Sequence, residues 1–99
     1  MHARVVAGEI APHRLDEAIH LWRAAVGPSV QHQPGFRSVR LLVDRQAGKV
    51  LSLAVWDDVQ AVQRTGGWNQ EQVAKFHGLF IAPPRIEEGF EVAVELTAP

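Results

Sequence analysis

The most constraining feature of this sequence is a hairpin whose strands are apolar on both faces. Alternation predicts strands over residues 36–44 and 49–56, joined by the short glycine-containing loop 45–48. In the second strand, one face takes Leu51, Leu53 and Val55, and the other takes Val50, Ala54 and Trp56. A sheet with one face in water should instead alternate apolar with polar side chains. We therefore expect both faces of this sheet to be covered.

The remaining segments complete a β-α-β-β-α-β order. A strand is expected over residues 2–10, followed by a helix from about residue 13 to 31 that kinks or restarts at Gly27-Pro28. A short helix should follow the hairpin and end near residue 65, and a longer helix should begin at Asn69 and end before Pro83-Pro84. The last strand is expected over residues 88–97. This order predicts one ferredoxin-like α+β domain over residues 1–99, with one antiparallel sheet and its helices on one face.

The length of the chain determines what covers the second face of the sheet. A chain of 99 residues that is 46% hydrophobic has no second helical layer to place there. An uncovered apolar face would exceed the few hundred Å² that monomers commonly expose. The simplest cover is a second copy of the chain, so we expect a homodimer that packs sheet face against sheet face.

Charge and cysteine content exclude several classes of site. The chain has no cysteine, which excludes a disulfide framework, a thiolate zinc site and a cysteine nucleophile. Its net charge of −1 gives no bulk attraction to nucleic acid or to a membrane surface, and no apolar run is long enough to span a bilayer. The five histidines are scattered, so no metal site is expected. No apolar leader follows Met1, and the cytoplasm is the expected compartment.

Several short motifs together resemble the antibiotic biosynthesis monooxygenase-like family. They are Leu15-Asp16-Glu17-Ala18 with Trp22, Gln33-Pro34-Gly35-Phe36, Leu41-Leu42-Val43-Asp44, and Val55-Trp56 before a helix with an acidic start. The resemblance extends over about residues 3–96 and implies a dimeric α+β barrel with a pocket between sheet and helices in each subunit. Members include cofactor-independent quinol oxygenases, which are thought to deprotonate a phenol or hydroquinone and let the anion react with dioxygen. Other members degrade haem, and the activity of many is unknown.

The sequence departs from both enzymatic patterns. Haem-degrading members resemble one another in an Asn on the first strand, where this chain reads Arg4-Val5-Val6-Ala7-Gly8, although Trp68 and His77 could supply the Trp and His of that pattern. Quinol-oxygenase-like members often carry histidines where this chain has Gln63-Arg64-Thr65. The chain also has no tyrosine, which excludes a tyrosine-dependent version of the chemistry.

His77 is the best candidate for a catalytic residue. The helical spacing places it on or beside an apolar stripe that faces the expected pocket, where an imidazole could accept a phenolic proton near neutral pH. The alternative is a partly buried histidine that bonds to backbone or water.

Five further residues are candidates for binding substrate. Trp68 could stack on an aromatic ligand, or it could pack against Val73 as a hydrophobic staple. Trp22, Phe76 and Phe80 could form pocket walls, or simply core. Arg40 could bind an anionic group or a partner's carboxylate across the dimer, or its head could reach solvent; the same alternatives apply to Arg4.

Two hypotheses follow for the function. The first is a cofactor-free monooxygenase that acts on a small phenolic or quinol-like molecule, with His77 as the base. The second is a non-catalytic dimeric module that binds a small hydrophobic metabolite. Haem degradation is a third hypothesis, disfavoured because the first strand lacks the Asn.

Overall fold

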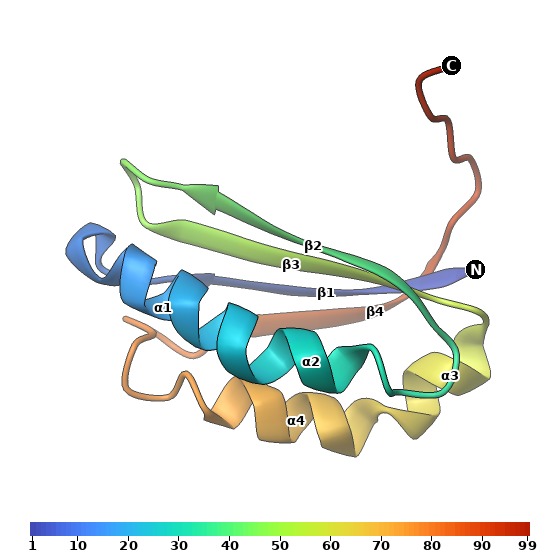
Figure 1. Cartoon of the computed structure of the whole chain (residues 1–99), viewed down its shortest axis with the longest axis horizontal. Helices are drawn as coiled ribbons and strands as arrows, with labels where there is room; N and C mark the ends of the chain where they lie inside the picture. The colour runs from blue at the N-terminus through green and yellow to red at the C-terminus, as the bar shows by residue number, and fades with distance from the viewer.

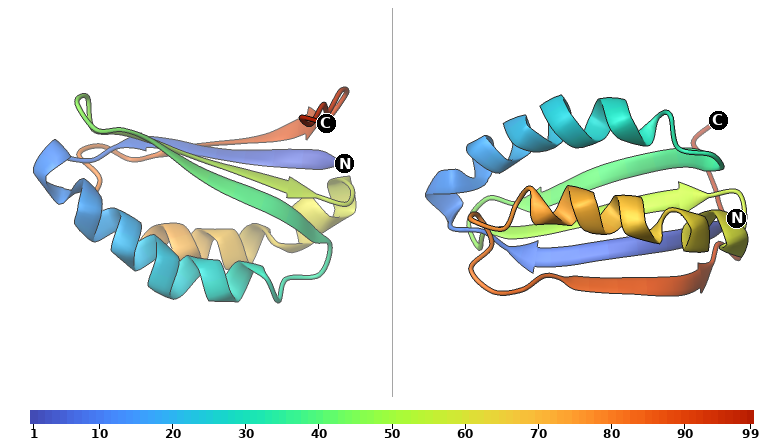
Figure 2. Two further views of the ribbon diagram at one scale, coloured as in Figure 1. Left: turned by 45° about the horizontal axis from the view of Figure 1, so that its top comes forward. Right: turned by 90° about the horizontal axis from the view of Figure 1, so that it is seen from below.

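The computed structural model describes all residues, 1–99, and has the predicted α+β architecture. Its elements are β1 (His2–Glu9), a 3-10 turn (Pro12–Arg14), α1 (Leu15–Leu21), a π-helical segment (Trp22–Val26), α2 (Gly27–Val30), β2 (Phe36–Asp44), β3 (Lys49–Trp56), α3 (Val59–Arg64), α4 (Gly66–Ala74) and β4 (Arg85–Glu91). The strands form one antiparallel sheet in the order β2-β3-β1-β4, and all helices lie on one face of it (Figures 1 and 2). The predicted ferredoxin-like class and the predicted bounds of the hairpin are confirmed.

The first long helix passes through the predicted break at Gly27-Pro28 by widening into a π turn. The Gly27 N–H donates to the carbonyl of Trp22, five residues back, instead of four. Pro28 has no N–H to donate, and its ring would collide with the carbonyl four residues earlier in a regular α-helix. The π turn keeps the helical path continuous while it accommodates Pro28.

The second helical region differs from its prediction at both ends. α4 begins at Gly66 and not at Asn69, because the Asn69 N–H already donates to the Thr65 carbonyl at 2.9 Å. α4 also ends at Ala74; Phe76 lies in the turns that follow it, and Phe80 forms an isolated antiparallel bridge with Ile10. Apolar spacing alone did not locate the end of this helix.

The last strand begins earlier than predicted and stops at Glu91. β4 pairs only with β1, and Glu91 already lies opposite His2, the first residue of β1. Beyond that point the sheet offers no partner except the Met1 carbonyl, which accepts from the Val92 N–H at 2.8 Å. Residues 92–99 therefore leave the sheet as an exposed tail on the side opposite the helices (Figure 1).

A β-bulge interrupts the pairing of β4 with β1. Val5 lies opposite Glu87, but Ala3 lies opposite Phe90, so Glu88 and Gly89 together oppose Arg4. Gly89 has a φ of 91°, in the left-handed region that suits glycine.

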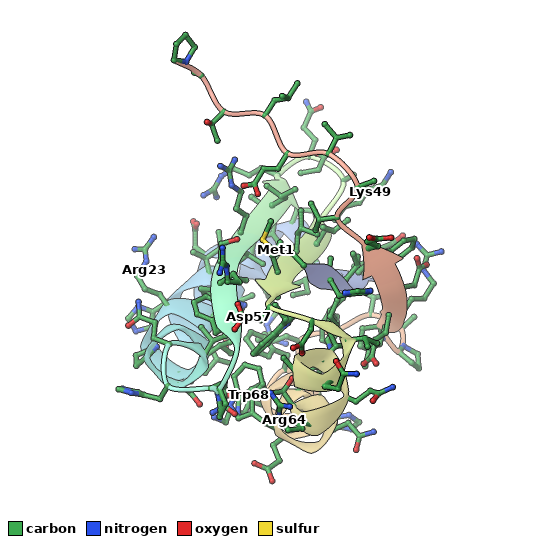
Figure 3. All side chains as sticks on the ribbon, turned by 90° about the vertical axis from the view of Figure 1, so that its right-hand side faces the viewer. Met1, Arg23, Lys49, Asp57, Arg64 and Trp68 are labelled. Atoms are coloured by element: carbon green, nitrogen blue, oxygen red, sulfur yellow. The ribbon has the colours of Figure 1, made fainter.

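The core lies between the sheet and the helices, in two clusters. One gathers around Ile10, Leu15 and Phe76, and the other around Trp56, Ala61 and Val62. Figure 3, a view from one end, shows the side chains that fill this layer, with Trp68 on the helical side of the sheet and Arg23 pointing away from the core.

The other face of the sheet is apolar and has no layer packed on it. Leu51, Leu53 and Val55 alternate along β3 with residues that face the helices, so they point from this open face. Leu42 and Phe90 add to it and are about half exposed, at 49% and 50%. The apolarity of both sheet faces is therefore a property of the folded chain.

None of the helices has both the length and the apolar character that a membrane span requires.

We expect Gly48→Ala to destabilise the fold. Gly48 has a φ of 72°, and a Cβ atom there would lie 2.1 Å from the Ile10 carbonyl oxygen. Strain of this kind should lower the free energy of unfolding by about 2 kcal/mol or more, measured by urea denaturation. Gly67→Ala is the matched control, since no atom lies within 4 Å of its added Cβ. Equal effects of the two substitutions would contradict this account.

Candidate active site

An apolar cavity of about 80 Å³ lies between the sheet and the helices. Sixteen of its twenty lining residues are hydrophobic, and they come from β1, β2, β3, the first long helix and the α4 region. A buried cavity of roughly 150 Å³ accepts benzene. The space in this structure is thus smaller than one aromatic ring needs, so a ring can enter only if the walls separate.

Four of the six predicted site residues line this cavity. Trp22 lies in the π segment, Trp68 in α4, Phe76 in the turns after α4, and Phe80 in the bridge to Ile10. The Trp68 Nε1–H donates to Ser29 Oγ at 2.7 Å, which joins α4 to α2 beside the cavity. The role of these four residues in substrate binding remains a prediction.

His77 and Arg40 do not line the cavity. Because α4 ends at Ala74, the helical spacing that was expected to turn His77 inward does not hold, and its exposed ring borders a separate depression with Val73 and Pro83. Arg40 lies on β2 between Val39 and Leu41, which do line the cavity, so its side chain points from the open face. The expectation that His77 faces the pocket is therefore wrong.

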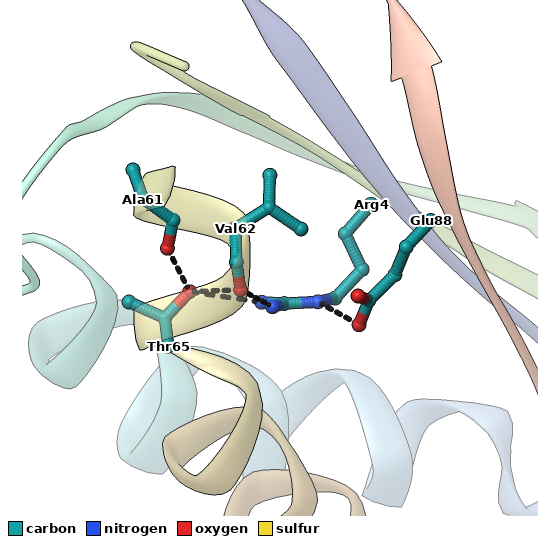
Figure 4. Close-up of polar contacts among 5 residues, drawn as sticks. All are labelled: Arg4, Ala61, Val62, Thr65 and Glu88. Carbon is teal, nitrogen blue, oxygen red and sulfur yellow. Dashed lines mark hydrogen bonds and ion pairs between the residues drawn. The ribbon is translucent and has the colours of Figure 1, made fainter. Parts of the chain in front are cut away.

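Arg4 is the charged residue at this site; the sequence allowed its head either to bind an anionic group or to reach solvent. Its side chain is 1% exposed, because β1 is a central strand and the guanidinium cannot reach past its neighbours to water. Nε donates to Glu88 Oε1 at 3.0 Å and Nη1 to Thr65 Oγ1 at 3.3 Å, while Nη2 donates to the Val62 carbonyl (Figure 4). The signal available in the sequence was an arginine on the inward parity of the first strand.

The partners of Arg4 come from three places in the chain. The β4 bulge opposes Arg4 with Glu88 and Gly89, and from there the Glu88 carboxylate reaches the guanidinium. Val62 supplies a carbonyl from the last turn of α3, where helix carbonyls lack intrahelical partners and a cation is favoured. Thr65, between α3 and α4, donates its own O–H to the Ala61 carbonyl at 2.8 Å. Arg4 thereby connects β1, β4 and the α3–α4 junction.

Trp56 forms the floor of the cavity beside Arg4. It is fully buried and packs edge-on against Phe36 and Trp68, with ring centroids 5.7 and 6.1 Å away. The Arg4 Cζ lies 5.6 Å from the Trp56 ring centroid, within the range of a cation–π interaction. The Trp56 Nε1–H is buried without a hydrogen-bond partner. An unsatisfied donor costs about 1–3 kcal/mol, so this group is ready to bind an acceptor.

The other polar groups on the cavity wall are neutral. They are the Ser52 hydroxyl and the amides of Asn69 and Gln72. Gln72 Oε1 accepts from Lys75 Nζ at 2.9 Å, which leaves the Gln72 amide N–H groups as donors. No carboxylate and no histidine lines the cavity, and no three His, Cys, Asp or Glu side chains gather as a metal site.

We expect Thr65→Val to destabilise the chain by about 1–3 kcal/mol, because it leaves an Arg4 N–H buried without its acceptor. Thr65→Ser keeps the hydroxyl and is the control. Urea denaturation of both variants measures the difference. If Val and Ser have the same effect, the hydroxyl contributes nothing to holding Arg4.

Two solved structures have the same fold as this chain. A monooxygenase of Streptomyces coelicolor in complex with nanaomycin D superposes with a TM-score of 0.78 at 18% identity, over 98% of this chain and 92% of that one. A protein of unknown function from Nitrosomonas europaea superposes with a TM-score of 0.76 at 19% identity, over 99% and 95%. At these identities the likeness shows the fold alone.

Relatives in sequence are uncharacterised proteins of Mycobacterium tuberculosis. One is 32% identical over 56 residues, which are 57% of this chain and 25% of the relative. Another is 30% identical over 92 residues, 89% of this chain and 37% of the relative. This chain thus spans between a quarter and two fifths of the length of these relatives. The model of the antibiotic biosynthesis monooxygenase family matches residues 1–75, from β1 to the last turn of α4. With that match over three quarters of its length, the chain belongs to the antibiotic biosynthesis monooxygenase family.

Proposed function

We propose that this protein is a cofactor-free monooxygenase that oxidises a small phenolic or quinol-like molecule with dioxygen. The observation that carries the proposal is a cavity walled by aromatic side chains that holds one buried cation, in a chain of this family. The Streptomyces coelicolor neighbour is a monooxygenase in complex with nanaomycin D, which supports a reaction of the same class.

The reaction needs no group beyond the substrate and dioxygen. A phenolate gives one electron to dioxygen, and the two radicals combine at a ring carbon as a peroxide. Loss of water from the peroxide leaves a quinone, so one oxygen atom enters the ring and the other departs in water with the phenolic and ring hydrogens. Trp22, Phe76 and Phe80 would exclude bulk water from these intermediates.

We infer that the cavity binds the anion, and that His77 does not generate it there. Arg4 is the ionisable side chain on the cavity wall, and it places a guanidinium cation there. His77 lies outside the wall, exposed to solvent. The phenolic proton would then pass to water before or during binding. The positive charge of Arg4 would lower the free energy needed for this ionisation.

Oxygen uptake tests the proposed reaction. We expect uptake with members of a phenol and hydroquinone panel, and loss of most of it in Ser52→Leu, which places an isobutyl group in the cavity. Ser52→Ala removes the hydroxyl without filling the space and should retain activity. Products measured with and without dioxygen confirm the source of the oxygen atom. Uptake that is unchanged in Ser52→Leu would place the reaction elsewhere.

His77→Ala tests the first hypothesis about the base. Because the ring lies outside the cavity, we expect kcat with the best substrate of the panel to change less than about threefold, a barrier change below about 1 kcal/mol. A loss of a hundredfold or more, with the fold intact by circular dichroism, would instead assign His77 as the base.

We also propose that two copies pair through their open faces. The face carries Leu51, Leu53 and Val55 together with Arg40 on β2 and Glu87 on β4, so a two-fold pairing can bury apolar area and oppose unlike charges. Sedimentation at micromolar concentration should give a dimer, and Leu53→Glu should give a monomer. Gln70→Glu, on the exposed side of α4, adds the same charge and should leave the dimer intact. A monomeric parent protein would contradict the pairing.

A binding module without catalysis is the second candidate. It is favoured by the absence of any histidine or carboxylate from the cavity wall. Native mass spectrometry of the purified protein separates the two: a retained aromatic ligand with no oxygen uptake across the panel supports binding alone, whereas turnover of that ligand supports the oxygenase.

A further inference from the structure

We propose that Arg4 and Trp56 make the cavity selective for the ionised form of an acidic phenol, and that Glu88 limits this selectivity. The inference concerns the cavity of the proposed function and rests on that function for its choice of a phenolic ligand.

Arg4 has hydrogen-bond donors that the protein itself does not use. A guanidinium has five N–H donors, and three are used by Glu88, Thr65 and Val62. Two donors remain on a side chain that lines the cavity and is 1% exposed. Buried donors of this kind prefer an acceptor, and an anionic oxygen is the strongest one.

Trp56 supplies a second unused donor, its indole N–H. Its ring lines the same cavity, and the Arg4 guanidinium lies 5.6 Å from the ring centroid. Trp68, by comparison, satisfies its own N–H on Ser29. The tryptophan at the end of β3 therefore has a donor with no use inside the chain, next to the buried cation. An oxygen atom of the ligand would satisfy donors of both residues.

The side chains on and near the cavity wall determine the sign of its electrostatic field. β2, β3 and the first long helix present neutral side chains to it, and Asn69 and Gln72 of α4 are neutral amides. Beyond the wall, Lys75 adds a cation bonded to Gln72. β4 supplies two carboxylates on this face of the sheet: Glu88, paired with Arg4, and Glu91, which lies opposite His2, the cross-strand neighbour of Trp56. The Glu88 side chain is 40% exposed, so water weakens its hold on Arg4. The cavity thus keeps a positive field that favours an anion over the neutral phenol.

The test uses p-nitrophenol, whose anion is yellow and whose neutral form is not, titrated against the protein under nitrogen. We expect the bound probe to ionise at a lower pH than the free probe. Arg4→Met should abolish this shift and weaken anion binding roughly 10- to 100-fold. Arg4→Lys should keep part of the shift, because the charge remains. Arg37→Met removes an exposed arginine paired with Asp57 and should change nothing.

Glu88→Gln should change the ionisation of the bound probe in the opposite direction to Arg4→Met, and it does not disturb the core. Removing the exposed carboxylate should increase the shift and tighten anion binding roughly three- to tenfold. Trp56→Phe keeps an aromatic ring but removes the N–H and part of the cavity wall, and should weaken anion binding. p-Nitroanisole, which cannot ionise, should bind all variants except Trp56→Phe with equal affinity.

Three results would overturn the inference: no binding of the probe, a bound probe that stays neutral, or a shift that Glu88→Gln leaves unchanged or reduces. The Glu88→Gln result does not depend on whether Arg4→Met folds. The failures are also separable from those of the proposed function. If the bound probe ionises at a lower pH but no oxygen is taken up, the anion site is supported and the oxygenase is contradicted. If oxygen is taken up but the ionisation of the bound probe does not shift, the oxygenase is supported and the anion site is contradicted.

Discussion

The buried guanidinium of Arg4 is the interaction on which the rest of the structure depends. A charge taken out of water is tolerated only where hydrogen bonds and an opposite charge compensate it. Arg4 obtains these from a carboxylate on an edge strand, a hydroxyl between two helices and a carbonyl at a helix end. The position of β4, the end of α3 and the start of α4 are thereby linked to one side chain on β1.

The same guanidinium shapes the cavity. Its charge lies against the Trp56 ring, and Trp56 in turn orders Phe36 and Trp68 around it. The cavity wall is thus mostly apolar but carries one positive charge, that of Arg4. If the proposed anion selectivity holds, this pocket would discriminate between ligands by their charge more than by their shape, because a neutral ligand of the same shape would leave its donors unsatisfied.

What the sequence could predict follows from how local each signal is. The hairpin strands have a period of two and a short loop between them, and their predicted bounds, 36–44 and 49–56, match β2 and β3. The last strand was predicted too long, because strand length depends on its partner and β1 offers none beyond His2. The position of His77 was wrong because α4 ends at Ala74, which apolar spacing alone did not reveal. The burial of Arg4 depends on β1 being central in the sheet, a non-local property of the topology.

The bulge at Gly89 divides the apolar residues of β4 between the two faces of the sheet. Ile86 lies opposite Val6 on the helical side, whereas Phe90, four residues later and of the same parity, lies opposite Ala3 on the open side. A regular strand would have placed both on one side. One glycine therefore determines that an aromatic ring joins the uncovered face. The same irregularity breaks the straight row of backbone donors and acceptors along this edge, which protects the sheet against endless strand-to-strand association with other copies.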